Sequence, residues 1–236
     1  MSDAGALRLA IVGAESTGKS TLGIDLAARL ASEFGVRAVV VPEVLREWCD
    51  AHGRTPRLDE QVDVAREQQR RIDAAAAQAD VVVCDTTPLM TAVYSEIVFG
   101  DLALDDAARA WQSSIDLTLL TGLDLPWVAD GLQRDGPHVR APVDAAVRAR
   151  LRAWGGEWTV VTGAGETRVE NALDAVRPAL ARWIERRVVR DERGAAAGLF
   201  TGLLASRTGP ARPLPRCERC DSGACEHLKH GVRPEA

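Results

Sequence analysis

Short apolar runs alternate along the chain with longer segments whose apolar residues recur at helical spacing. Such runs are typical of buried strands. The runs predicted as strands are residues 7–12, 36–41, 81–84, 117–121 and 158–163. Because strands and helices alternate, we expect an α/β fold: a mostly parallel, five-stranded sheet covered by helices on both faces.

The helical segments differ in how polar they are. Leu22, Leu26 and Leu30 recur at helical spacing and predict a helix after the first strand. Residues 58–79 predict a long polar helix with a thin apolar stripe. The stripe is assigned to Val62, Ala65, Gln69, Ile72 and Ala76. Further helices are expected at residues 88–99, 105–115 and 143–154, and from 168 to about 189.

A change in composition near residue 190 predicts a domain boundary. The glycines that follow suggest a loosely structured linker. We therefore expect a nucleotide-binding domain at residues 1–189 and a linker with a Cys/His tail at residues 190–236.

One motif lies between the first strand and the first helix and fits G-x-x-x-x-G-K-[ST] at every fixed position. Its residues are Gly13, Ala14, Glu15, Ser16, Thr17, Gly18, Lys19, Ser20 and Thr21. A loop of this kind surrounds phosphate oxygens with backbone N–H groups at the positive end of a helix. The motif predicts that the chain binds a nucleoside triphosphate.

Two side chains of the motif have expected roles, and a third residue further along the chain supports them. Lys19 should contact the β- and γ-phosphates, and the Ser20 hydroxyl should bind Mg²⁺. Asp85 ends an apolar strand, as expected of an acid that supports the Mg²⁺ shell. The alternative is that Asp85 or Thr86 caps the helix that begins near Pro88.

Glu43 directly follows the second strand. In open α/β sheets, residues just past the carboxyl ends of strands contact ligands, which would place Glu43 beside the phosphate loop. Its carboxylate can accept the proton of an attacking hydroxyl, or hold Mg²⁺ through water. Alternatively, it complements a helix dipole. Arg46 should face the same region and meet phosphate or pair with Glu43.

The segment after the fourth strand resembles a lid. It is polar and contains glycine, proline and arginine, with Arg134 and Arg140 among its arginines. Lid arginines can neutralise charge on a transferring phosphoryl group, although these two can also be ordinary surface residues. Trp127 can stack on a planar ligand ring or pack in the core, and Asp130 begins the segment expected to close over the transfer.

Two further clusters complete the candidate sites. Residues 163–168, after the last strand, are expected to contact the nucleotide base, with Arg168 among them. In the tail, the spacing C-x₂-C-x₄-C-x-H suits the tetrahedral preference of structural zinc. Its residues are Cys217, Cys220, Cys225 and His227, with His230 as an alternative fourth ligand. The competing interpretation is a disordered tail with accidental cysteines.

Composition narrows the classes of partner. A net charge of -5 provides no general attraction to nucleic acid or to an anionic membrane. No apolar run approaches the roughly twenty residues that a membrane-spanning helix needs. The first residues lack a basic region followed by an apolar one, so no secretory signal is predicted and the expected compartment is the cytosol. The expected partner is a small-molecule nucleoside, and the sequence indicates no oligomeric state.

Several of these motifs together resemble the ribosylnicotinamide kinase domain of NadR-like proteins. The resemblance covers residues 7–187 and includes residues 13–21, 42–47, 84–87, 124–131 and 163–168. It implies a P-loop kinase fold with strand order 2-3-1-4-5 and a lid after the fourth strand. It also implies transfer of the ATP γ-phosphate to the 5′-hydroxyl of nicotinamide riboside. NadR proteins typically carry an adenylyltransferase domain before the kinase, and this sequence begins at the P-loop strand, so we expect a stand-alone kinase domain.

The sequence thus predicts a nucleoside kinase that uses ATP and Mg²⁺, with a structural zinc ion in its tail as a further hypothesis. Lys19, Glu43, Asp85 and Arg134 are the expected catalytic residues, and Arg46, Trp127 and Asp130 the expected acceptor contacts. The alternative function is a nucleotide-dependent switch that hydrolyses ATP slowly and signals through a partner.

Overall fold

The computed structural model describes residues 5–128 and 136–206, with side chains up to residue 189. The chain divides into two units, Met1–Arg187 and Val188–Ala236, and the first contains the whole sheet. The elements in chain order are β1 Leu7–Val12, α1 Lys19–Phe34, β2 Ala38–Val41, α2 Val44–His52, the 3₁₀ turn η1 Leu58–Glu60, α3 Gln61–Ala76, β3 Val81–Asp85, α4 Pro88–Phe99, α5 Asp105–Gln112, β4 Leu117–Thr121, the 3₁₀ turn η2 Pro137–Val139, α6 Arg140–Trp154, β5 Trp158–Val161 and α7 Gly165–Ser206.

The sheet is parallel throughout, and its strand order is β2-β3-β1-β4-β5. Both the predicted fold class and the predicted order are confirmed. The three central strands are almost fully buried, whereas most residues of β2 and β5 are only partly buried because each strand lies at an edge. The second strand is also shorter than the predicted residues 36–41 and less buried than expected.

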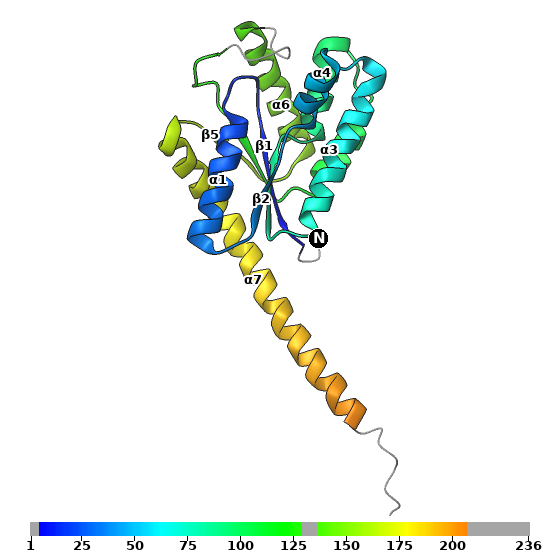
Figure 1. The fold of residues 1–236 in the computed structure, drawn as a ribbon, viewed down its shortest axis with the longest axis vertical. Helices are drawn as coiled ribbons and strands as arrows, with labels where there is room; N and C mark the ends of the chain where they lie inside the picture. The colour runs from blue at the N-terminus through cyan, green and yellow to red at the C-terminus, as the bar shows by residue number, and fades with distance from the viewer. Residues whose placement is uncertain (1–4, 129–135, 207–236) are drawn as a thin grey trace, which may run out of the picture. The chain divides into compact units, whose positions relative to one another are not determined.

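Helices cover both faces of the sheet (Figure 1). Side chains alternate between the two faces along a strand. Leu9 and Ile11 of β1 accordingly pack against α1 and α7, whereas Ala10 and Val12 pack against α4 and α6. Toward the β2 edge, the second face is covered by α3 and α5.

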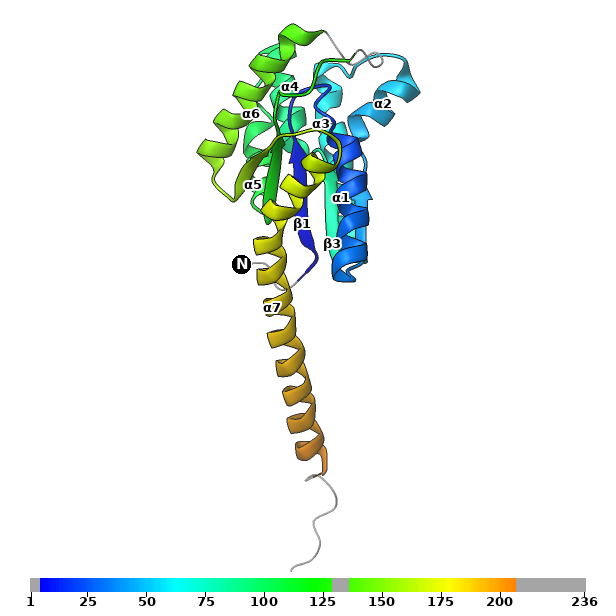
Figure 2. The ribbon, with the colours of Figure 1, turned by 90° about the vertical axis from the view of Figure 1, so that its left-hand side faces the viewer.

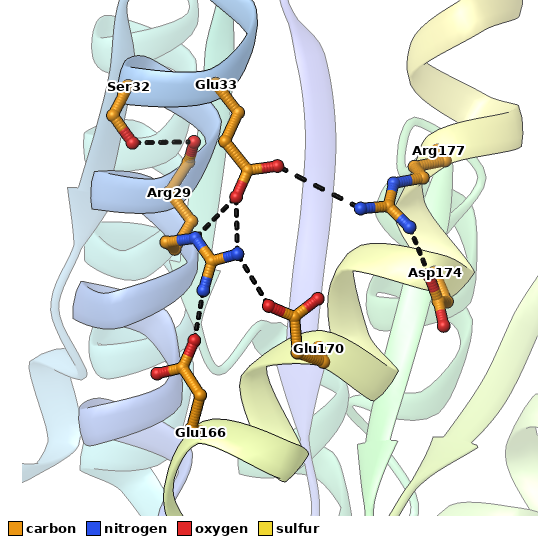
Figure 3. A network of polar contacts seen from close by, with 7 residues as sticks. All are labelled: Arg29, Ser32, Glu33, Glu166, Glu170, Asp174 and Arg177. Carbon is orange, nitrogen blue, oxygen red and sulfur yellow. Dashed lines mark hydrogen bonds and ion pairs between the residues drawn. The ribbon is translucent and has the colours of Figure 1, made fainter.

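The first part of α7 lies beside α1 (Figure 2), and ion pairs join the two helices (Figure 3). Arg29 of α1 lies between Glu33 and two residues of α7, Glu166 and Glu170, with 2.6 Å between the Arg29 guanidinium and the Glu170 carboxylate. Arg177 of α7 lies 3.9 Å from Glu33. These side chains are partly exposed, so water and salt screen each pair and its contribution to stability is small. Together they help to hold the start of α7 beside the helix that follows the phosphate loop.

Three expectations about helices need correction. The predicted helix at residues 58–79 is a 3₁₀ turn followed by α3, and the buried residues of α3 are Gln61, Val64, Gln68 and Ile72. Of the expected stripe, Ile72 is buried and Ala76 packs beside it, but the other expected positions are only partly buried because two buried positions hold glutamine. The predicted linker is helical at its start, since α7 continues to Ser206. Finally, α6 begins at Arg140 and not at residue 143, and Arg140 is buried, which contradicts its interpretation as an ordinary surface residue.

Candidate functional site

The loop between β1 and α1 has a backbone path that depends on its glycines. Gly13 has φ +147°, and a Cβ at this position would lie 2.2 Å from Thr121 Oγ1. Gly18 has φ +74° and is the N-cap of α1. Ser16 also has positive φ, at 55°. Side chains with a Cβ rarely adopt this conformation, so the surrounding structure must hold Ser16 in place.

Hydroxyl groups provide part of that support. Thr17 Oγ1 donates to Ala14 O at 2.8 Å and lies 2.7 Å from Thr121 Oγ1 at the end of β4. Ser16 Oγ accepts a hydrogen bond from the Val128 amide at 2.8 Å. The loop is thus attached both to the end of a neighbouring strand and to the segment that follows it.

Arg168 supports the same loop from α7. It is 4% exposed and donates to Thr17 O at 2.9 Å and to Gly163 O at 2.7 Å. Its guanidinium also pairs with Asp124 at 3.2 Å, and Asp124 accepts a hydrogen bond from the Gly163 amide at 2.7 Å. Burial raises the pKa of Asp124, but the Gly163 amide and Arg168 outweigh this effect and lower the pKa below its ordinary value. These contacts make Arg168 a brace of the phosphate loop, while its predicted contact with the nucleotide base stays a prediction.

The phosphate side of the site combines the loop with the end of β3. Lys19 Nζ donates to Ala14 O at 3.0 Å, so its ammonium lies over the loop. Asp85 is paired in register with Ile11 of β1, and the next residue, Thr86, has φ +71° and donates its amide to Ile11 O at 3.0 Å. The N-cap of α4 is Thr87, which argues against the capping alternative for Asp85.

The donor set at this position suits a magnesium ion. Asp85 is 3% exposed, and its Oδ1 has no hydrogen-bond partner among the described residues. A buried carboxylate oxygen in that situation favours a cation. Carboxylate and hydroxyl oxygens are the ligands that Mg²⁺ prefers, and Ser20 in the first turn of α1 provides the hydroxyl.

A cavity of about 190 Å³ adjoins the loop. It is lined by Glu15, Ser16 and Lys19 of the loop region and by residues from α2, from the start of α3 and from α4. The residues contributed by the rest of the chain are Glu43, Leu45, Arg46, Cys49, Thr55, Pro56, Gln61, Tyr94, Val98 and Phe99. Lys19 and Glu43, which the sequence predicted to lie at one site, therefore both line this cavity.

Glu43 is held between β2 and α2. It is 9% exposed and is the N-cap of α2, but its side chain makes no capping hydrogen bond to that helix. Arg46 Nε lies 3.8 Å from Glu43 Oε2, so the expected pairing of Arg46 with Glu43 is present. The arginine also lines the cavity.

Eight of the residues that line the cavity were not identified from the sequence, and Tyr94, Phe99 and Gln61 are among them. Tyr94 and Phe99 contribute aromatic surface from α4. Gln61 is 5% exposed and donates from Nε2 to Pro56 O at 3.3 Å, while its Oε1 is buried without a hydrogen-bond partner among the described residues. Their spacing could have revealed that Gln61 is buried, since Gln61, Val64 and Gln68 recur at three- and four-residue intervals on α3.

The remaining predicted residues separate into two groups. Trp127 is partly buried and is not among the residues that line the cavity, so its contact with an acceptor stays a prediction. Asp130, Arg134 and the Cys/His cluster lie outside the described residues. That cluster is Cys217, Cys220, Cys225, His227 and His230.

Within the described part of the chain, no group of three or more His, Cys, Asp or Glu residues could hold a metal ion. Nor does any helix described there have the length and apolarity needed to cross a membrane.

Comparison with known families identifies the domain. Residues 8–168, which include the loop, Glu43, Asp85 and Arg168, match the family model described as AAA domain. The chain belongs to this AAA domain family. A search of curated proteins found no significant match.

Solved structures agree with this family assignment at the level of the fold. NadR protein in complex with NR superposes with a TM-score of 0.62 at 22% identity, over 74% of this chain and 51% of that chain. NadR protein in complex with NAD and AMP-PNP gives a TM-score of 0.58 at 19% identity, over 74% and 49%. Thymidylate kinase from Ehrlichia chaffeensis gives 0.53 at 18% identity, over 73% and 98%. This AAA domain protein thus spans about half the length of the NadR chains, and its likeness to the NadR fold is confirmed.

Proposed function

We propose that the protein transfers the γ-phosphoryl group of ATP to the 5′-hydroxyl of a nucleoside, with nicotinamide riboside as the preferred acceptor. The observation that carries the proposal is the shared cavity, which Lys19 lines from the phosphate loop and Glu43 lines from the end of β2. The solved relatives in fold include NadR protein in complex with NR, NadR protein with NAD and AMP-PNP, and a thymidylate kinase.

The donor side binds and neutralises the triphosphate. Loop amides from residues 13–20 surround the phosphates at the N-terminus of α1, and Lys19 moves from Ala14 O to the phosphate oxygens. Ser20 and Asp85 would hold Mg²⁺, which would supply positive charge to the β- and γ-phosphates. Most of the work is positioning and charge stabilisation, because the transition state is loose.

The acceptor side provides the base. As the bond between the acceptor's 5′-oxygen and the γ-phosphorus forms, the bond from that phosphorus to the ADP oxygen breaks. The hydroxyl proton passes to the Glu43 carboxylate, which lies in the same cavity as Lys19. ADP and the nucleoside 5′-monophosphate are the products. Arg46, 3.8 Å from Glu43, pairs with that carboxylate or meets phosphate oxygens.

The cavity lining selects the kind of acceptor. Tyr94 and Phe99 offer aromatic surface to a planar base. The buried Oε1 of Gln61 accepts an N–H or O–H donor, such as a carboxamide or a ribose hydroxyl. Trp127 and Asp130 would complete the acceptor contacts, and Arg134 the charge stabilisation of the transferring group.

In the tail, we propose a structural zinc ion held by Cys217, Cys220, Cys225 and His227. Metal analysis of protein purified without a histidine tag should find about one zinc per chain, lost in a Cys217→Ser/Cys220→Ser variant. A zinc content near zero, with the tail equally sensitive to protease before and after chelation, would count against this site.

The test of the main proposal is a screen for ADP release from Mg·ATP across a panel of nucleosides that includes nicotinamide riboside. ADP release should rise sharply with the accepted nucleoside, and mass spectrometry should find its 5′-monophosphate in equal amount. A slow ATP hydrolysis that no nucleoside changes would contradict the kinase proposal and favour the nucleotide-dependent switch.

A further inference from the structure

The buried side of α3 carries a polar side chain that contacts the backbone next to Glu43. Gln68 is 3% exposed, and its neighbours on the same buried side are Gln61, Val64 and Ile72. A buried amide is costly unless it is hydrogen-bonded. Gln68 makes two hydrogen bonds, and both involve the backbone next to Glu43.

The two bonds bracket Glu43. Gln68 Oε1 accepts from the Val44 amide at 2.8 Å, and Gln68 Nε2 donates to Pro42 O at 3.2 Å. Pro42 and Val44 are the residues immediately before and after Glu43. Because Val44 N–H can only donate and Pro42 O can only accept, a single amide orientation satisfies both. No other uncharged side chain of this length offers a donor and an acceptor together.

This arrangement also replaces part of the capping of α2. The first N–H groups of a helix lack partners within the helix, and an N-cap side chain often supplies one. Glu43 occupies the N-cap position but makes no capping hydrogen bond, while Gln68 satisfies the amide of Val44. The helix start is therefore stabilised without recruiting the Glu43 carboxylate as its cap.

We propose that Gln68 is a positioning residue for Glu43: its amide fixes the backbone on both sides of Glu43, so that the carboxylate faces the reacting hydroxyl. The inference rests on the proposed function in that it takes Glu43 as the base. Displacing the base by about 1 Å can lower the rate by about 10²-fold. The donor side has its own supports and should be unaffected.

The experiment is a double-mutant cycle between Gln68 and Glu43. Gln68→Met keeps the length and packing of the side chain but removes both hydrogen bonds. We expect kcat to fall by about 10- to 100-fold, with the KM for ATP changed by less than about 2-fold. In a Glu43→Gln background, Gln68→Met should lower kcat by less than about 3-fold, because there is no base left to position.

Matched controls separate positioning from a general structural effect. Gln69→Met makes the same substitution one residue along α3, at a half-buried position, and should leave kcat unchanged. If Gln68→Met does not fold, Gln68→Leu serves instead, since it is also uncharged and makes neither hydrogen bond. An equal loss in both backgrounds, or a loss in thermal stability without a loss in kcat, would overturn the proposal.

A second readout does not depend on catalysis. Carbon-13 NMR of the Glu43 carboxyl, assigned with Glu43→Gln, should show a different chemical shift and titration in Gln68→Met and an unchanged signal in Gln69→Met. An unchanged Glu43 signal in Gln68→Met would refute the positioning role. If no nucleoside accelerated ADP release in the wild type, the proposed function would fail, while the NMR comparison would still decide whether Gln68 positions Glu43.

Discussion

The two sides of the cavity are built differently, although both lie at the carboxyl ends of the same sheet. On the donor side, the phosphate loop is fastened by contacts from β4, the segment after it and α7: Thr121, Val128 and Arg168 all bond to it. On the acceptor side, the Gln68 amide brackets the backbone around Glu43 at an edge strand. Exposed apolar residues such as Val98 and Phe99 adjoin this side.

The difference suggests a division of tasks. A triphosphate has the same shape in every turnover, and a loop with three positions in strained or glycine-dependent conformations needs rigid support. An acceptor must enter, be recognised and leave as product, which suits a less densely bonded wall. Changes to the supports of the phosphate loop should therefore raise the KM for ATP and lower stability together. Changes on the acceptor side should affect kcat or the acceptor KM, with little effect on the KM for ATP.

The largest expected effect is that of Lys19→Ala. Lys19 acts on phosphate charge, and its one side-chain hydrogen bond shown here is to Ala14 O. Phosphoryl transfer should fall by about 10³-fold or more, while the thermal midpoint stays within a few degrees of the wild type. Coupled ADP assays and circular dichroism measure the two quantities. Lys229→Ala, at the chain's other lysine, is the control. Near-normal turnover of Lys19→Ala would remove the basis for the donor side.

On the acceptor side, Glu43→Gln should lower kcat by about 10²-fold and leave the KM for ATP almost unchanged, because it removes the base and keeps the shape. Glu47→Gln, on the same helix and paired at the surface with Arg71, is the matched control and should be silent. Asp85→Asn should instead shift the Mg²⁺ concentration that half-maximal activity requires. If Asp85→Asn lowered kcat alone and Glu43→Gln were silent, the two carboxylates would have exchanged roles.

The division between the two sides also explains which parts were predictable. The donor side follows from contiguous residues, since the motif fixes the loop and one apolar run ending in Asp85 fixes the neighbouring strand. The sheet order followed from the family resemblance. The acceptor side depends on Gln61, which lines the cavity, and on Gln68, which braces Glu43. Both are polar but buried, so the apolar pattern found only Ile72 of the four buried residues of α3. The bracing role of Arg168 requires contacts across more than a hundred residues, which spacing does not reveal.

A smaller effect should separate two candidates for acceptor recognition. Gln61→Leu removes the buried acceptor oxygen, and we expect the KM for the nucleoside to rise about 10-fold with the KM for ATP unchanged. Trp127→Ala should have the same effect only if Trp127 stacks on the acceptor, although it lies outside the cavity lining. Steady-state kinetics at saturating ATP measure both. A normal nucleoside KM in Gln61→Leu would exclude it from recognition.

Arg168→Met tests the donor side through its support. Loss of this buried cation leaves Thr17 O, Gly163 O and Asp124 without their partner, so we expect the free energy of unfolding to fall by about 3 kcal/mol and the KM for ATP to rise. Arg177→Met on the same helix removes only partly exposed pairs and should cost less than about 1 kcal/mol. A change in the preference between ATP and GTP at unchanged stability would favour contact with the base instead.

The smallest effect concerns pH and the carboxylate that pairs with Arg168. The folded protein lowers the pKa of Asp124, so its ionised form stabilises the fold fully above the unfolded pKa of about 4 and loses that contribution as pH falls toward the folded pKa. Asp124→Asn should therefore be less stable than the wild type at pH 7, and the gap should narrow below about pH 4. Urea unfolding midpoints at pH 7, about 5, about 4 and about 3 measure it. Asp174→Asn, whose exposed carboxylate pairs with Arg177 further along α7, is the control and should show a much smaller gap at every pH. A gap for Asp124→Asn that stayed constant down to about pH 3 would mean that the Asp124 side chain supports the loop by its shape and not by its charge.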